Sequence, residues 1–95
     1  MAAMEEPPLR VPVEDSLDLH AFSPRDVTSV VLEYLGAAAA AGFREVRLIH
    51  GKGTGFQRAA VREALARHPL VVSYSDADPS SGGWGATRVI LRPAR

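Results

Sequence analysis

Three glycines alternate with other residues in the short stretch 50–55, which runs His-Gly-Lys-Gly-Thr-Gly. The apolar run 45–49 before it predicts a buried strand, and the periodic segment 57–68 after it predicts a helix. The stretch is therefore a strand-to-helix turn, and its glycines let a ligand approach the backbone N–H groups and the helix N-terminus, which suits an anion. We predict a phosphate-contacting loop with a titratable histidine, His50, beside it. The loop residues predicted to contact the phosphate are Gly51, Lys52, Gly53, Thr54 and Gly55.

Hydrophobic periodicity along the rest of the chain predicts the element order β-α-β-α-β-β. Strands are expected over 14–20, 46–49, 71–75 and 86–91, and helices over 24–41 and 57–68. Two right-handed crossovers make the first three strands parallel, and the fourth strand, which no helix precedes, should run antiparallel. The predicted fold class is α/β, arranged as an α+β two-layer sandwich with one mixed four-stranded sheet and both helices on one face. The other face is expected to show Arg47, Ile49, Arg88, Ile90 and Arg92, unless the tail or a partner covers it.

The residues at the helix ends carry capping signals. Ser23 is a candidate cap for the first helix, with Pro24 at its first position, and Gly42 fits the left-handed conformation that ends a helix. Thr54 and Gln57 have the spacing of a capping box for the second helix.

Length and composition indicate one globular domain. The chain has 95 residues, of which 46% are hydrophobic and 23% charged, and we expect a flexible tail over 1–12 and a folded domain over 13–95. It has no cysteine, which excludes a disulfide framework, a cysteine nucleophile and a cysteine metal site. Neither a secretory signal nor an apolar run of membrane-spanning length is present, so a cytoplasmic location is expected.

The net charge of zero hides a separation of sign along the chain. Residues 1–41 hold seven acids against two arginines, whereas residues 42–95 hold nine bases against four acids. The basic half begins just before the glycine-rich loop and is weak support for an anionic partner. A pI near 6.8 argues against strong non-specific binding to nucleic acid.

Two histidines close the first two predicted strands. Asp18 and His20 end the first strand and His50 ends the second. If the strands are neighbours, these side chains and the glycine loop meet at one rim of the sheet, where ligands of parallel α/β sheets bind. On a strand, Asp18 and His20 share a face, so the carboxylate can orient the imidazole or raise its pKa.

These residues carry a resemblance to a known family, the Smr (small MutS-related) domain, in its stand-alone bacterial form. The family's two signatures match Leu17-Asp18-Leu19-His20 and His50-Gly51-Lys52-Gly53, and the likeness continues through Thr54-Gly55, His68-Pro69 and the run 82–87, Gly-Gly-Trp-Gly-Ala-Thr. It covers roughly residues 14–92. One position departs from the family pattern: Ala21 stands where a glycine is usual, and alanine disfavours positive φ, so the turn after the first strand is expected to differ.

The resemblance implies an endonuclease that nicks DNA or cleaves RNA, in some members on stalled ribosomes, with a fold like the C-terminal domain of a bacterial translation initiation factor. It implies that Asp18 and His20 are the functional pair of the first motif and that His50, Gly51 and Gly53 match the second. The chemistry of phosphodiesters then makes His20 a candidate general base or acid, and His50 the opposite proton-transfer partner or a donor to phosphate. A structural role for His50, as a cap of the strand or a bond to the loop backbone, is an equal alternative. RNA is slightly favoured, because its 2′-hydroxyl can be the nucleophile. With DNA, water must attack, and a divalent cation (Mg²⁺ or Mn²⁺) held by Asp18 is then the alternative to a metal-free reaction.

Two other classes of function stay open. The domain could bind nucleic acid or the ribosome without cleaving, or bind a protein through its open sheet face. Arg58 and Arg62, four residues apart on the second helix, are candidate phosphate contacts or an ordinary solvated face. Trp84 is a candidate for stacking on a base or for packing on the sheet.

Overall fold

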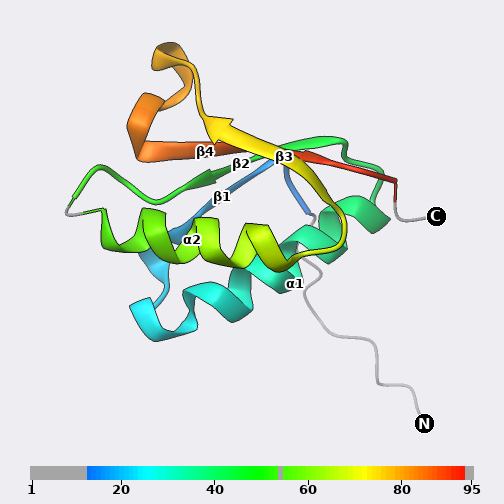
Figure 1. The fold of residues 1–95 in the computed structure, drawn as a ribbon, viewed down its shortest axis with the longest axis horizontal. Helices are drawn as coiled ribbons and strands as arrows, with labels where there is room; N and C mark the ends of the chain where they lie inside the picture. Colours follow the sequence, from blue (N-terminus) through cyan, green and yellow to red (C-terminus); the bar gives the residue numbers. More distant parts are fainter. Residues whose placement is uncertain (1–12, 54, 94–95) are drawn as a thin grey trace, which may run out of the picture.

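The computed structural model describes residues 13–53 and 55–93 (Figure 1). The strands are β1 (Ser16–Asp18), β2 (Glu45–Ile49), β3 (Val71–Asp76) and β4 (Ala86–Leu91), and the helices are α1 (Val27–Ala40) and α2 (Phe56–Arg67). The predicted element order is thereby confirmed. The tail predicted over 1–12 lies outside the described residues. Neither helix in the described part of the chain is long and apolar enough to cross a membrane.

One four-stranded sheet in the order β1-β2-β4-β3 forms the first layer, and both helices pack on the same side of it (Figure 1). β1 pairs with β2 in parallel, while β4 is antiparallel to both β2 and β3. β1, β2 and β3 therefore run in one direction and β4 runs against them, as predicted. The place of β4 between β2 and β3 was not predicted, because residue periodicity gives strand direction but not strand order.

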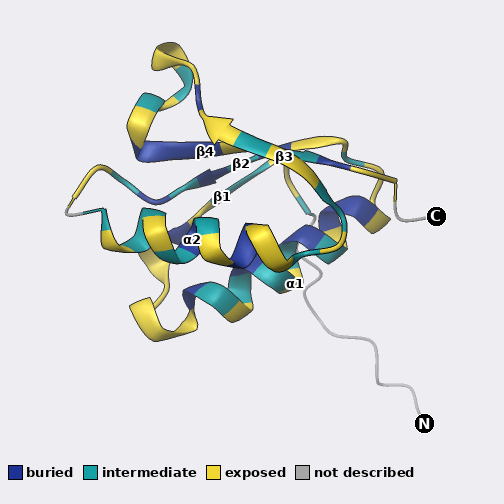
Figure 2. Ribbon diagram, viewed as in Figure 1, coloured by how far each residue is buried: buried dark blue, intermediate teal, exposed yellow. Residues whose placement is uncertain are grey.

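The core lies between the sheet and the helices, where Figure 2 shows the buried residues. β2 alternates as a one-sided strand should: Val46 and Leu48 are buried, whereas Arg47 and Ile49 are half-buried on the open face. The core side chains below 2% exposure come from every layer and include Leu19, Val27, Val31, Leu35, Val46, Leu48, Val61, Leu65, Val89 and Leu91.

The first strand is shorter than the predicted span 14–20. It ends at Asp18, and a 3-10 turn over Leu19–Ala21 follows. The Asp18 carboxylate accepts the backbone N–H of His20 at 2.9 Å, which closes the turn, while Leu19 is fully buried. Ala21 is accommodated there without a positive φ, a conformation that no non-glycine residue adopts in the described part of the chain.

The helix ends agree only partly with the capping signals. Gly42 has φ +99° after α1, as predicted. Ser23 makes no side-chain capping bond, and α1 begins at Val27 after a 3-10 turn over Pro24–Asp26. α2 is preceded by Gly55, with φ +87°, as its N-cap, and Thr54 lies outside the described residues.

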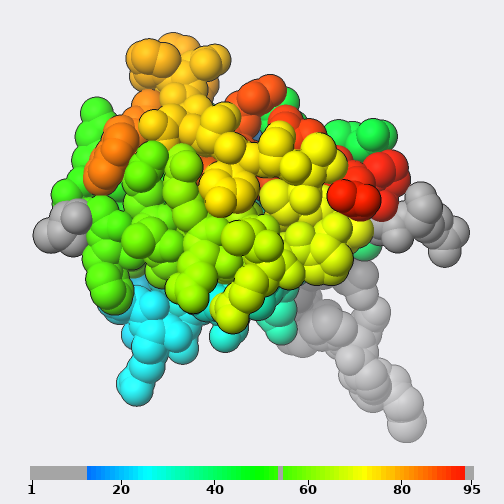
Figure 3. Space-filling model, viewed as in Figure 1, coloured from blue at the N-terminus to red at the C-terminus, as the bar shows by residue number. Residues whose placement is uncertain are grey.

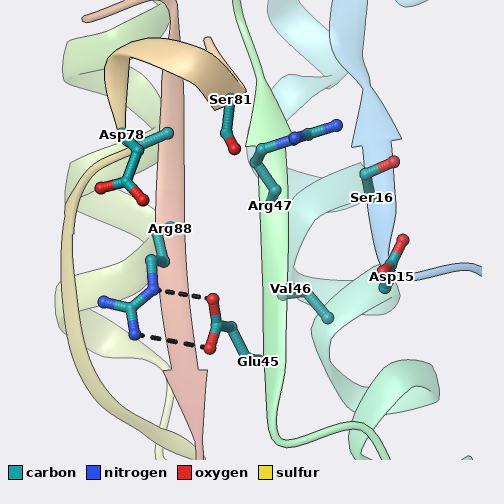
Figure 4. Close-up of a pocket in the computed structure, with 9 residues that line it drawn as sticks. Asp15, Ser16, Glu45, Val46, Arg47, Asp78, Ser81 and Arg88 are labelled. Carbon is teal, nitrogen blue, oxygen red and sulfur yellow. Dashed lines mark hydrogen bonds and ion pairs between the residues drawn. The ribbon is translucent and has the colours of Figure 1, made fainter. Parts of the chain in front are cut away.

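The open face of the sheet holds a polar hollow of about 320 Å³ (Figure 4). Arg88 and Glu45 cross its floor as an ion pair with an Nε–Oε2 distance of 2.7 Å, and this contact raises the pKa of Arg88. Arg47 lies between this pair and Ser16 of β1, to which it is directly opposite in register. Arg88 and Arg92 are exposed and the other predicted open-face residues are half-buried, so the predicted composition of this face is confirmed.

Truncating the core at β2 should destabilise the fold. Leu48 is fully buried, so Leu48→Ala is expected to lower the free energy of unfolding by about 2–5 kcal/mol. Val72, on the edge strand β3, is 55% exposed, so Val72→Ala should change the free energy of unfolding by less than about 0.5 kcal/mol. Urea titrations followed by circular dichroism measure both values. Equal losses in the two variants would contradict this assignment of the core.

Candidate functional site at the histidine and glycine loop

Asp18 and His20 form a closed pair at the end of β1. The Asp18 Oδ1 atom lies 2.6 Å from His20 Nδ1 and also accepts the backbone N–H of His20. These two bonds, the backbone one foremost, hold the pKa of Asp18 below its ordinary value. Because a carboxylate only accepts, His20 Nδ1 must carry a proton, and Nε2 is then the free ring atom. Nε2 has no hydrogen-bond partner among the described residues, so the pair presents one available nitrogen.

His20 Nε2 points at the loop that follows β2. A Cβ atom added to Gly51 would lie 2.8 Å from it, and Gly51 has φ +81°. Both facts require glycine at this position, because a side chain would be strained and would displace the imidazole. The two motifs that are far apart in sequence therefore meet at this contact, as the predicted convergence of strand ends required.

His50 is buried, with 5% exposure, and both of its ring nitrogens are engaged. Nδ1 lies 3.0 Å from the carbonyl oxygen of Gly51, and Nε2 lies 2.9 Å from Thr87 Oγ1. A carbonyl can only accept, so Nδ1 carries the proton and Nε2 accepts from the Thr87 hydroxyl when the ring is neutral. Burial, with the nearby positive charges of Arg58 and Arg62, lowers the pKa of His50.

The segment before β4 supports the glycine loop from behind. The carbonyl oxygen of Gly85 accepts the N–H of His50 at 3.0 Å and that of Gly51 at 2.8 Å. A Cβ atom on Gly85 would lie 3.2 Å from Lys52 Cγ. The N–H of Gly51 is therefore used internally, and a ligand must find other loop donors, such as Gly53, which is exposed.

A hollow of about 340 Å³ opens over these residues. Its lining side chains and backbone come from both motifs and from the first turn of α2: His20, His50, Gly51, Lys52, Gly53, Gly55, Phe56, Gln57 and Arg58. The structure thus brings together most of the predicted site. Asp18 stands behind His20 rather than in the lining, Arg62 is outside the lining, and Thr54 lies outside the described residues.

Arg58 and Arg62 are both bound to one carboxylate. Each donates from its Nη2 atom to Asp76 Oδ1 at 2.7 Å, and the pairing lowers the pKa of Asp76. Arg58 also lies over the ring of Trp84 at 4.9 Å and Arg62 over that of Tyr74 at 5.3 Å. The two arginines therefore join α2 to β3, whose green and yellow surfaces lie side by side in Figure 3. Of the two, only Arg58 also faces the hollow.

The sequence prediction missed residues that support the site. Asp76 ends a strand parallel to β1 and β2, so its position at the same rim was available from the topology. Thr87 is buried on the same face of β4 as Val89 and Leu91, but its contact with His50 depends on β4 lying next to β2. The inclusion of Phe56 in the hollow had no signal in the periodicity.

The described residues offer limited support for a bound metal ion. No group of three His, Cys, Asp or Glu side chains that could hold one is found over residues 13–53 and 55–93. In this part of the chain the carboxylate of Asp18, the predicted ligand, is hydrogen-bonded to His20. This donor set does not fit a resident metal centre.

A family model described as the Smr domain matches residues 17–92. The chain belongs to the Smr domain family. The match includes both histidine motifs, the glycine loop and all of the sheet except Ser16, the first residue of β1. The mixed sheet with two helices is the α+β fold of solved Smr structures.

Relatives and solved structures agree with this membership. The chain is 46% identical over 77 residues to an "Endonuclease MutS2" of Thermus thermophilus and 44% identical over 80 residues to one of Caldicellulosiruptor saccharolyticus, and these alignments cover 81% and 84% of this chain. It spans only about 10% of the length of each of these relatives. The Smr domain structure of Thermus thermophilus MutS2 superposes with a TM-score of 0.79 at 44% identity, covering 84% of this chain and 100% of that one. YdaL, a stand-alone small MutS-related protein from Escherichia coli, gives 0.78 at 33% identity, covering 85% and 66%.

Gly51→Ala should disturb the His20 ring of this Smr domain. The positive φ alone is expected to lower the free energy of unfolding by about 1–2 kcal/mol, and the added methyl group must displace the imidazole. Gly53→Ala is the matched control, because its Cβ meets nothing within 4 Å. NMR spectra of the imidazole ring and urea titrations measure the two effects. An unchanged His20 ring in Gly51→Ala would contradict the observed contact.

Stability should fall as the pH is lowered through the range just below 6.5. The folded-state pKa of His50 is below its ordinary value of 6.5, so the unfolded chain binds more protons there and acid favours unfolding. Thermal unfolding of the parent and of His50→Gln, followed from neutral to mildly acidic pH, measures this dependence. The slope should be weaker in His50→Gln. Equal slopes would contradict a buried neutral His50.

Proposed function

We propose that this Smr domain is an endonuclease that cleaves phosphodiester bonds of nucleic acid, with RNA favoured over DNA. The observation that carries the proposal is the Asp18–His20 pair. It leaves the Nε2 atom of His20 available at a hollow that Lys52 and the first residues of α2 also line. The names of the MutS2 relatives, which are called endonucleases, support the same class of activity.

His20 is the proposed proton-transfer residue. As the attacking hydroxyl forms its bond to phosphorus, the bond from phosphorus to the leaving oxygen breaks, and a water molecule protonates that oxygen. Asp18 fixes the tautomer with Nδ1 protonated, so that neutral Nε2 can accept the proton of the attacking hydroxyl. This is the role that a carboxylate plays behind a catalytic histidine in hydrolases. The Asp18 carboxylate stays charged to below its ordinary pKa of 3.8, so it also stabilises the imidazolium that forms.

The loop is the proposed phosphate site. The Lys52 ammonium group and the backbone N–H groups of Gly53 and Gly55 would face the charge that develops on the phosphoryl oxygens. Thr54, the other predicted contact, lies outside the described residues. Gly51 contributes shape rather than a donor, because its N–H is bound to Gly85. Arg58 adds positive charge at the edge of the hollow, although Asp76 partly neutralises it.

His50 is assigned here to positioning. Its ring holds the Gly51 carbonyl and Thr87, so it fixes the loop without a free nitrogen for proton transfer. With RNA, the 2′-hydroxyl supplies the nucleophile next to His20. With DNA, a water molecule must take that place.

His20→Ala should slow cleavage by roughly 10²–10⁴-fold, the usual contribution of a general acid–base group, while nucleic-acid binding stays nearly unchanged. Time courses with single-stranded RNA and supercoiled DNA, each with Mg²⁺, Mn²⁺ or chelator, measure the rate and the metal dependence. His68→Ala is the matched control. His68 lies directly after the end of α2, outside the lining of the hollow, and its Nδ1 atom accepts the backbone N–H of Leu70.

Equal cleavage by His20→Ala and the parent would overturn the catalytic assignment. Binding without cleavage by the parent would instead favour a non-catalytic nucleic-acid or ribosome-binding module. A partner whose binding is insensitive to salt and to Lys52→Ala would favour a protein-interaction domain.

A further inference from the structure

Phe56 is the most exposed large apolar side chain in the described part of the chain, with 68% of its surface accessible. It is the first residue of α2, directly after Gly55. A single exposed apolar residue is common on protein surfaces and by itself needs no explanation. The position of Phe56 is the informative fact, because this residue lines the hollow that His20 and Lys52 also line.

A second aromatic ring, that of Trp84, lies next to Gly55. The Trp84 Cη2 atom would lie 3.3 Å from a Cβ on Gly55, and the Arg58 guanidinium covers the ring at 4.9 Å. Arg58 also donates to Asp76 at 2.7 Å. The hollow therefore combines the positive charges of Lys52 and Arg58 with the aromatic residue Phe56, and Trp84 and Asp76 contact Arg58 from outside the lining.

We propose that Phe56 stacks on an unpaired nucleobase next to the phosphate held at Lys52, so that the substrate must be single-stranded at the site of cleavage. This inference rests on the function proposed above and adds the substrate class to it. Cationic groups that follow a backbone, interleaved with aromatic rings that stack on bases, are the physical means by which proteins bind single strands. In a duplex the base faces are already stacked on each other, and Phe56 has no face to bind.

Phosphate contact and base stacking can be separated with three probes. These are a labelled single-stranded oligodeoxynucleotide of about 12 nucleotides, within the usual site sizes, an abasic strand of the same length with the same phosphates, and the blunt duplex of the same sequence. Fluorescence anisotropy in chelator, with DNA that lacks the 2′-hydroxyl, gives the dissociation constants. Trp84 is the only tryptophan of the chain, so its emission reports binding independently of the label.

Phe56→Ala is expected to weaken binding of the single strand by about 5- to 150-fold, the range that base–aromatic stacking contributes. Binding of the abasic strand and of the duplex should stay unchanged. Phe56→Tyr should keep the parent affinity, because it keeps the aromatic face. Val72→Ala, another exposed apolar residue but on β3, should match the parent on every probe.

Three results would overturn the stacking proposal: equal affinity of the parent for the single strand and the abasic strand, an equal loss on all probes in Phe56→Ala, or a loss in Phe56→Tyr as large as in Phe56→Ala. If Lys52→Ala still weakens binding of all three probes, the phosphate site of the proposed function stands although stacking fails. Failure of the parent to bind any probe would overturn the stacking proposal, and the cleavage time courses with RNA test the proposed function separately.

Discussion

The pairing of β4 with β2 is the constraint on which the candidate site depends. It inserts the last strand into the middle of the sheet and brings the segment before it against the glycine loop. Two backbone bonds to the Gly85 carbonyl and the bond between His50 and Thr87 all follow from this pairing. The loop after β2 is therefore held by β4 and the segment before it, together with the bond from His50 to the Gly51 carbonyl.

In the resulting site, the residues that support the loop are buried, whereas the residues that a ligand can reach are exposed. His50 and Thr87 are buried and fully engaged with each other and with the loop, whereas His20 and Lys52 are exposed. The Asp18 carboxylate does both. It accepts the backbone N–H of His20, which closes the turn after β1, and it accepts the ring Nδ1–H of His20, which orients the imidazole. Such an arrangement holds the Nε2 atom of His20 in a fixed direction while the His20 side chain stays open to solvent.

The sequence predicted the elements well because their signals are local. Alternation over 86–91 and the helical spacing from Val27 to Ala38 give strand and helix without knowledge of neighbours. It failed at the ends of elements, where a single local bond decides the conformation. The strand expected through His20 stops at Asp18, because the aspartate side chain satisfies the next backbone N–H and turns the chain.

The sequence by itself determined the two motifs and the positive φ of Gly42. It predicted that Asp18, His20 and the glycine loop meet at one rim only if the first two strands are neighbours, because parallel strands end on the same side, and the structure supplied that pairing. Only the tertiary structure decided which polar groups of these residues are already hydrogen-bonded and which stay available to a ligand. It shows that both nitrogens of His50 are occupied and that Asp76 binds Arg58 and Arg62, since these contacts join segments separated by 14 to 37 residues. Contacts across such separations depend on strand order, which no local pattern encodes.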